Sequence, residues 1–262
     1  MSRRLLATLV VVAVAVALGA LVAGAAGRPR AAATVPETNP CFTDKSLLCP
    51  DLTMGKPSSM FASRTPGGRV LLHATSNIKS RGLGPIEVHG RRIAKRKMRV
   101  TQRIYRRGGS HLDVRTKGRL HFWFIPGQGR YWKFADAAAF ELWSLNPDGT
   151  RRKVVRRGEK TRYCLRDLVR TAPSRRSPRK AVYPGCNQDP SEKFVTLGTS
   201  VGWSDIYPST YYEQYIDVTR LRGCFSYVLF ADPKDHIFES NEENNLAQRV
   251  VRLPFGSRKK CR

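Results

Sequence analysis

Short runs of β-branched and aromatic residues, separated by turn residues, constrain this fold more than any other feature of the chain. Several of them alternate apolar and polar residues with a period of two, and most have the length of a strand. The sequence therefore predicts an all-β fold, a β-sandwich with irregular loops. The runs cover residues 70–75, 85–88, 99–105, 120–125, 140–145, 153–155, 162–165, 215–218, 225–230 and 249–253.

Turn chemistry supports this interpretation. In residues 146–149, Pro147 presets φ and Gly149 accepts a left-handed conformation, so a turn is expected there. Residues 106–110 predict a hairpin tip. Helical periodicity is weak throughout, and 134–139 is the one short segment that suggests it.

The amino terminus predicts export. Arg3 and Arg4 precede an uncharged apolar run over 5–26, which ends in small residues at 23–25. This layout is typical of a secretory signal peptide. An uncleaved membrane anchor is the alternative, because about 20 apolar residues can cross a bilayer. Residues 27–66 are predicted as a linker and an irregular arm, and 67–262 as one sandwich domain.

The cysteines agree with export. An even number of cysteines in an exported chain predicts a disulfide framework, although free thiols remain an alternative. No C-x-x-C pair occurs, which argues against zinc-ribbon and thioredoxin-like sites. Sequence alone does not decide the pairing; closure between neighbours predicts Cys41–Cys49, Cys164–Cys186 and Cys224–Cys261.

The formal charge of +27 favours polyanionic partners. For an exported protein these are cell-wall polymers or anionic lipid headgroups, and no specific binding to nucleic acid is expected. The densest basic clusters are 91–97 and 151–157. Two alternatives stay open: basic residues can protect strand edges from added strands, and an arginine-rich composition can simply be solvated.

Ordinary catalytic motifs are missing. The sequence has no G-x-S-x-G, no H-E-x-x-H and no Walker loop, and its histidines are scattered singly. Three sets of segments carry more information. They are 127–134 with 140–142, then 158–167, and finally 202–207 with 214–219 and 239–245.

In order and spacing these segments resemble the catalytic domain of lysyl oxidases, over about Val70 to Leu253, as in a divergent bacterial member. The resemblance implies that family's β-sandwich. It also implies copper-dependent oxidative deamination of peptidyl lysine, with a protein-lysine or other amine as substrate. The family's quinone cofactor, lysyl tyrosylquinone, forms from a lysine and a tyrosine of the chain itself. By the family's motifs these match Lys160 and Tyr207.

The family's copper histidines, spaced as H-x-H-aromatic-H, match Gly129, Tyr131 and Lys133. None of these side chains replaces an imidazole as a copper ligand. Copper and the quinone are therefore doubtful here, which indicates a degenerate enzyme. We hypothesise that Lys133 stands in for the metal's positive charge and pairs with Asp136 or Asp205.

An acidic stretch near the carboxyl terminus could hold calcium, although a polar hairpin is the alternative. For the whole protein, the main alternative to a degenerate lysyl-oxidase-like protein is a non-catalytic basic module that binds anionic cell-envelope polymers. An adhesion-type sandwich module is a third interpretation. The acidic stretch comprises Asp232, Asp235, Glu239, Glu242 and Glu243.

Overall fold

The computed structural model describes residues 35–259 and 261, and it confirms the all-β prediction. The predicted leader, 1–26, lies outside the described residues. One short helix, α1 (Pro40–Thr43), precedes the strands. Within the described part of the chain, no helix is long and apolar enough to cross a membrane.

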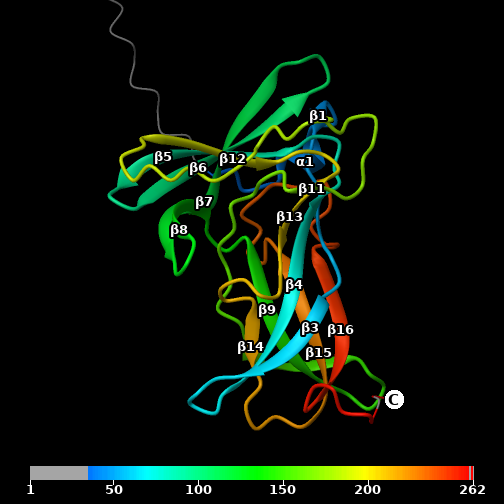
Figure 1. The fold of residues 1–262 in the computed structure, drawn as a ribbon. Helices are drawn as coiled ribbons and strands as arrows, with labels where there is room; N and C mark the ends of the chain where they lie inside the picture. Colours follow the sequence, from blue (N-terminus) through cyan, green and yellow to red (C-terminus); the bar gives the residue numbers. More distant parts are fainter. Residues whose placement is uncertain (1–34, 260, 262) are drawn as a thin grey trace, which may run out of the picture. The chain divides into compact units, whose positions relative to one another are not determined.

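The first sheet is an antiparallel meander of β5, β6, β7 and β8, which hairpin turns connect in sequence (Figure 1). β12 pairs with the outer side of β5, and β1 adds to β6. The predicted hairpin tip at 106–110 joins β6 to β7. The bounds are β1 (Leu47–Leu48), β5 (Ile86–Ala94), β6 (Lys97–Arg106), β7 (His111–Ile125), β8 (Gly129–Phe134) and β12 (Phe194–Thr199).

The second sheet is organised by one long strand, β4 (Val70–Ser80). Its carboxyl-terminal half pairs with β13 and β2, and its amino-terminal half pairs with β14 and β3. β11 adds to β13. The bounds are β2 (Leu52–Met54), β3 (Ser58–Arg64), β11 (Val169–Arg170), β13 (Trp203–Tyr207) and β14 (Tyr215–Asp217).

The third sheet runs in the order β10-β9-β15-β16, and all of its pairs are antiparallel. The predicted turn at 146–149 joins β9 to β10. The bounds are β9 (Ala138–Leu145), β10 (Arg151–Arg157), β15 (Gly223–Ala231) and β16 (Leu246–Leu253).

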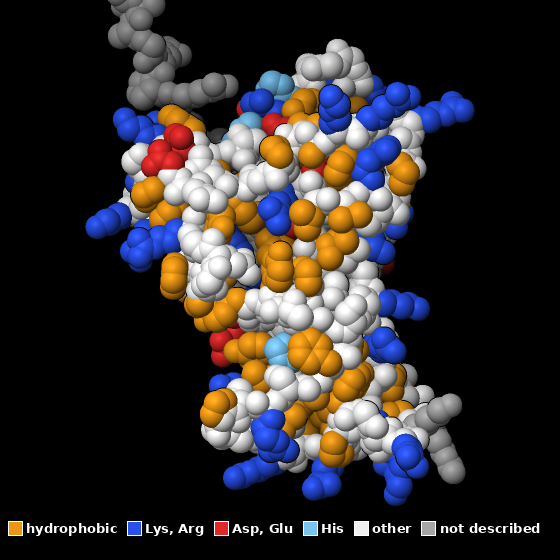
Figure 2. Space-filling view, in the orientation of Figure 1, with side chains coloured by type: hydrophobic (Ala, Val, Ile, Leu, Met, Phe, Trp, Pro, Cys, Tyr) orange, Lys and Arg blue, Asp and Glu red, His pale blue; other side chains and the backbone are white. Residues whose placement is uncertain are grey.

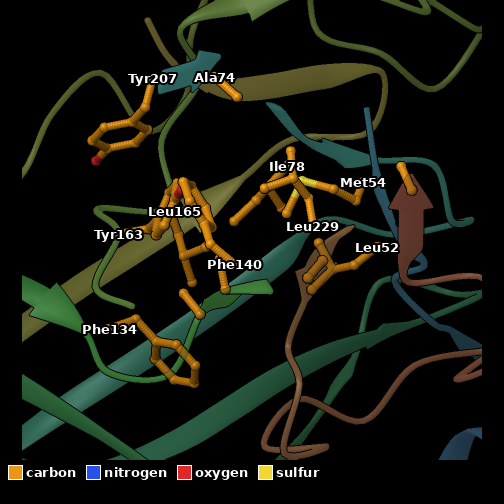
Figure 3. Close-up of a cluster of buried hydrophobic side chains, with 14 of the residues drawn as sticks. Leu52, Met54, Ala74, Ile78, Phe134, Phe140, Tyr163, Leu165, Tyr207 and Leu229 are labelled. Atoms are coloured by element: carbon orange, nitrogen blue, oxygen red, sulfur yellow. The ribbon is translucent and has the colours of Figure 1, made fainter. Parts of the chain in front are cut away.

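One hydrophobic core draws side chains from all three sheets, and Figure 3 shows part of it. On β4 the alternation predicted from sequence buries every second side chain, and Leu72 and Ile78 are fully buried. Burying such a side chain contributes roughly 1.5–3 kcal/mol. Tyr163 and Tyr207 belong to the same core.

Besides β8, β11, β12 and β13, which no predicted run covers, the structure differs from the sequence prediction at three places. The run at 162–165 is a loop, attached by a single bridge between Tyr163 and Phe134, because its backbone turns at Leu165 (φ 53°). Residues 134–139 form a turn between β8 and β9 and no helix. Part of the predicted irregular arm forms β1, β2 and β3, which gain order by pairing with β4 and β6. The division into segments at 26 and 66 stays a prediction.

The three predicted disulfides are confirmed. Cys41–Cys49, Cys164–Cys186 and Cys224–Cys261 each join cysteines whose Cα atoms are 5.4–5.8 Å apart. Cys164–Cys186 matters most for the site, because it closes the loop that follows Lys160.

Candidate functional site

Tyr207, at the end of β13, is the centre of the candidate site. Only 3 % of it is exposed. Its hydroxyl accepts the backbone N–H of Cys164 at 3.1 Å, and the ring of Tyr163 packs edge-on with the centroids 4.4 Å apart. Burial, with the neighbouring Asp205, raises the pKa of Tyr207 well above its ordinary value. The phenol is therefore neutral and held in one place.

Lys160 lies over this ring, in the loop after β10. Gly158 lets the loop approach closely, because a Cβ at position 158 would lie 2.8 Å from the carbonyl oxygen of Tyr215. Lys160 is 2 % exposed, and its Nζ lies 4.4 Å from the centre of the Tyr207 ring. The structure thus brings together the two residues that the family resemblance singles out. Their role as quinone precursors stays a prediction.

Lys133, on β8, approaches the same ring. It is also 2 % exposed, and its Nζ lies 5.3 Å from the ring centre of Tyr207. Two amines therefore face one phenol. Cation–π attraction gives about 0.5–2 kcal/mol. Removing an ammonium ion from water costs several kcal/mol, so the ring alone does not compensate for burying either charge.

Neither amine has a conventional partner. Among the described residues, no acceptor forms a hydrogen bond or ion pair with the Nζ of Lys133 or Lys160; the one lysine Nζ that does so belongs to Lys234. Burial, reinforced by the charge of Lys133, lowers the pKa of Lys160 to about 7. Burial likewise lowers the pKa of Lys133 to about 8, even though Asp205 opposes the change.

Asp205, on β13, is the nearest acid of this cluster in sequence to Tyr207, and it is fully buried. Its Oδ2 accepts the N–H of Leu165 at 3.1 Å, and Arg166 Nε lies 3.9 Å from Oδ1. Burial raises the pKa of Asp205 to about 7, although Arg166 and Lys133 lower it. Burial thus shifts both the acid and the amines toward their neutral forms.

The hypothesis that Lys133 forms an ion pair is wrong for both of its candidate partners. Asp136 pairs instead with Lys234, at 3.1 Å. Asp205 acts on Lys133 electrostatically, without a contact short enough for an ion pair.

A cavity of about 430 Å³ opens beside this cluster. Lys133 and Tyr207 line it, whereas Lys160 is not part of the wall. The disulfide Cys164–Cys186 forms another part of the wall. The remaining lining residues are Gln128, Tyr131, Arg166, Gly185, Gln188 and Tyr211.

The positions that match the family's copper histidines do not fit copper. Gly129 has φ 118°, a conformation that favours glycine and would strain a histidine. The hydroxyl of Tyr131 donates to the carbonyl of Gln128 at 2.5 Å, and Lys133 brings a cation or a lone amine. Within the described residues, no group of three His, Cys, Asp or Glu side chains is placed to hold a metal.

Two histidines on other strands, His73 and His89, make structural contacts. His73 stacks on Phe61 with the ring centroids 4.4 Å apart and hydrogen-bonds Ser63 at 2.8 Å. His89 bonds the carboxylate of Glu87 at 2.6 Å. Neither belongs to the cavity beside Tyr207.

The acidic stretch forms a polar loop, and calcium binding finds no support in it. Its buried carboxylates accept hydrogen bonds from the protein: Asp232 from the N–H of Ile237, and Glu239 from the N–H of Leu52 and the amide of Asn245. These contacts agree with the alternative that the acids satisfy backbone and amide donors.

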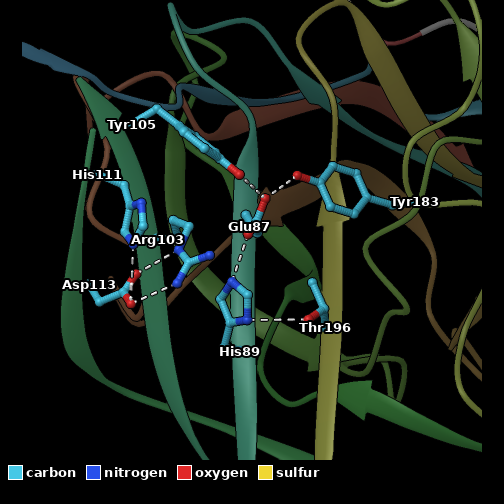
Figure 4. Close-up of polar contacts among 8 residues, drawn as sticks. All are labelled: Glu87, His89, Arg103, Tyr105, His111, Asp113, Tyr183 and Thr196. Atoms are coloured by element: carbon cyan, nitrogen blue, oxygen red, sulfur yellow. Dashed lines mark hydrogen bonds and ion pairs between the residues drawn. The ribbon is translucent and has the colours of Figure 1, made fainter. Parts of the chain in front are cut away.

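Sequence reasoning missed a polar network on the first sheet, shown in Figure 4. Glu87 on β5 accepts hydrogen bonds from the hydroxyls of Tyr105 and Tyr183, at 2.8 and 2.5 Å, besides its contact with His89. It also missed Tyr163 and Glu213 beside the two lysines. No local motif announces the contacts of Tyr183 and Glu213, because each joins segments far apart in the chain.

An all-β, disulfide-bonded domain with a lysine and a tyrosine packed together at its core defines a narrow class of proteins. Residues 85–257 match the family model described as lysyl oxidase, and the chain therefore belongs to the lysyl oxidase family. It matches no curated protein. The disulfides and the family agree with an extracellular location.

Proposed function

We propose that this chain is an exported, non-oxidising member of the lysyl oxidase family, which acts by binding anionic polymers of the cell envelope. The first half of this proposal rests on Lys133. A buried amine, close to Tyr207, stands where the family resemblance expects the last imidazole of the copper site. Gly129 and Tyr131 supply no imidazole either, so copper-dependent oxidation of Tyr207 has no support from these side chains.

The observation that carries polymer binding is a basic hairpin surface at the turn between β5 and β6. Its basic side chains are exposed, and in the described part of the chain none of them pairs with an acid. Exposed Ile93 and Phe194 lie among them, around a depression of about 520 Å³. The basic residues of this surface are Arg91, Lys95, Arg96, Lys97 and Lys193.

Edge protection does not explain this charge. β5 lies between β12 and β6, so it has no free edge to protect. The other basic cluster lies on β10, which is an edge strand of its sheet, and there the protective role fits. Figure 2 shows Lys and Arg side chains projecting around the region of β5 and β6. Cationic side chains beside an aromatic ring suit an anionic polymer better than a neutral one.

The polymer is expected to reach this surface outside the cytoplasm. We propose that the apolar run at 5–26 directs export. Cleavage would release the protein, and retention of the run would hold it at the membrane, close to cell-wall polymers and anionic lipid headgroups.

Amine oxidation is the second candidate function, and one observation favours it. Lys160 Nζ lies 4.4 Å from the centre of the Tyr207 ring, so the two side chains are close enough to be joined if the ring were oxidised. Refolding the protein with copper tests both candidates by metal content, intact mass and quinone staining. We expect no stoichiometric copper and the mass of the unmodified, disulfide-bonded chain. Copper at one equivalent with a Lys160–Tyr207 cross-link would establish the oxidase instead.

Binding to a teichoic acid tests the basic hairpin surface. The variant Lys95→Ser/Arg96→Ser/Lys97→Ser removes three charges from it. The matched control, Arg152→Ser/Lys153→Ser/Arg156→Ser, removes three exposed charges from β10. At about 1 kcal/mol for each basic residue near an anionic surface, we expect the first variant to weaken binding about tenfold or more at moderate salt.

The control should lose much less affinity. Equal losses in the two variants would reduce the effect to net charge and contradict a dedicated surface. Binding to anionic vesicles without binding to the polymer would assign the surface to lipid headgroups.

A further inference from the structure

The wall of the cavity beside Tyr207 carries an amine that polymer binding does not use. Lys133 is almost completely buried, yet it lines the 430 Å³ cavity. Within the described residues its Nζ has no hydrogen-bond acceptor or carboxylate partner. An amine that has no partner among the described residues, on the wall of a cavity, points to a ligand that supplies the missing interaction.

The surroundings favour the reactive form of this amine. Burial disfavours an ammonium ion here, and the guanidinium groups of Arg166 and Arg162 add repulsion, while the carboxylates of Asp205 and Glu213 oppose both effects. Burial accordingly lowers the pKa of Lys133 to about 8. A lysine that is desolvated and close to other cations is the arrangement in which an amine becomes a nucleophile near neutral pH.

We propose that Lys133 captures carbonyl compounds, forming a Schiff base with an aldehyde that enters the cavity. The lone pair of Nζ attacks the carbonyl carbon, and a proton moves from nitrogen to oxygen to give a carbinolamine. Loss of the hydroxyl with a proton then forms the C=N bond and releases one water. No electrons are gained or lost, so the step needs no metal and no oxidant.

The lining of the cavity defines the class of carbonyl compound. Tyr131, Tyr207 and Tyr211 offer ring surface, while Gln128 and Gln188 offer hydrogen bonds. The guanidinium of Arg166 lies on the same wall and favours a carboxylate. A small aldehyde that bears a carboxylate fits this combination, and a neutral aldehyde of the same size lacks the contact with Arg166.

Lys160 is not the amine that we expect to react. It does not line the cavity, and it lies closer to the Tyr207 ring than Lys133 does, at 4.4 Å against 5.3 Å. The charge of Lys133 helps to lower the pKa of Lys160 to about 7, so Lys160 releases its proton before Lys133 does. In the family the cofactor's carbonyl captures a substrate amine, and here the roles of amine and carbonyl are exchanged.

Reductive trapping tests the proposal on the full disulfide-bonded chain. The protein is treated with glyoxylate and sodium cyanoborohydride at pH 7, and peptide mass mapping locates the adducts. We expect Lys133 to be modified at least about tenfold faster than exposed Lys95 and Lys193, because each unit by which a pKa is lowered gives about tenfold more free amine. Propanal should label Lys133 more slowly than glyoxylate does.

Variants separate this chemistry from general lysine labelling. Lys133→Met should abolish the fast adduct, and the matched control Lys193→Met should keep it. If Lys133→Met does not fold, the parent chain is labelled in two states, folded and after reduction and denaturation. The proposal requires that the preference for Lys133 disappear in the unfolded chain. Modification of surface lysines alone, or of Lys160 in place of Lys133, would overturn the proposal. The basic hairpin variant should label normally, so polymer binding and carbonyl capture can fail independently.

Discussion

Glu87 on β5 and Lys133 on β8 belong to the same sheet and are almost equally buried, with 6 % and 2 % of the residue exposed. Burial alone would raise the pKa of Glu87, but hydrogen bonds from His89, Tyr183 and Tyr105 outweigh it and hold that pKa at about 2. Lys133 has no such partner, and burial lowers its pKa to about 8. One group stays charged, and the other moves toward neutrality.

The difference shows that depth in the fold does not decide the state of an ionisable group. What decides is whether the protein replaces the hydrogen bonds that water gave. Around Glu87 the replacement is complete, as expected of a structural network. Around Lys133 and Lys160 it is missing, which is a property of reactive sites. Variants at Glu87 and at Lys133 can therefore be compared directly, because the first group has hydrogen-bond partners and the second has none among the described residues.

The largest expected effect comes from Glu87→Ala. The substitution leaves two tyrosine hydroxyls and His89 without their acceptor. We expect the free energy of unfolding in urea at pH 7 to fall by about 3 kcal/mol, because each unsatisfied buried group costs about 1–3 kcal/mol. Glu243→Ala, at an exposed acid, should change it by less than about 0.5 kcal/mol. Similar values for the two variants would show that the Glu87 network is not structural.

The dependence of stability on pH below neutrality gives a second test of Glu87→Ala. The folded pKa of Glu87, about 2, lies below its ordinary value of 4.5. Its stabilisation is therefore fully present above pH 4.5 and is lost as the pH falls toward 2. The stability of Glu87→Ala should depend less on pH in that window than the stability of the parent chain.

The second effect is smaller and has the opposite sign. Lys133→Met keeps the length of the side chain and removes a buried amine that lacks a partner. We expect stability at pH 6 to rise by on the order of 1–3 kcal/mol. Exposed Lys193→Met provides the control. A loss of stability in Lys133→Met would mean that Asp205 compensates the charge of Lys133, as in a buried ion pair.

The dependence of stability on pH above neutrality gives a second test of Lys133→Met. The folded pKa of Lys133, about 8, lies below its ordinary value of 10.5. Between these values the unfolded chain holds a proton that the folded chain has released, so this group makes stability rise with pH. The rise should be weaker in Lys133→Met than in the parent chain, as thermal unfolding at several pH values would show.

Most of the fold was predictable because its signals are local. β4, β15 and β16 show strand-length runs of β-branched and aromatic residues, and the disulfides join cysteines that are neighbours along the chain. β8 escaped prediction, since charged Arg130 and Lys133 interrupt its apolar pattern. β3 escaped for a related reason: it is a mostly exposed strand that gains its order from β4.

The site was predictable only in part. The resemblance to lysyl oxidases pointed to Lys160, Tyr207 and Lys133, but spacing along the chain does not place two lysine side chains against the ring of Tyr207. The lack of a partner for Lys133 is a property of the assembled core, which no short segment encodes. The Glu87 network is similar, because Tyr183 lies 96 residues from the carboxylate that it binds.

The smallest expected effect concerns one hydrogen bond of that network. Tyr183→Phe removes a hydroxyl that donates to Oε2 of Glu87, while Tyr105 still donates to the same oxygen and His89 to Oε1. Because the carboxylate keeps two partners, we expect a loss of about 1 kcal/mol in thermal or urea unfolding. The exposed Tyr212→Phe should be neutral. The pKa of Glu87 should rise in Tyr183→Phe, so the loss of stability below pH 4.5 should be smaller and should level off at a higher pH than in the parent chain. If both variants match the parent chain at every pH, then His89 and Tyr105 alone are enough to keep Glu87 charged. The hydrogen bond from Tyr183 would then contribute nothing to the difference between Glu87 and Lys133.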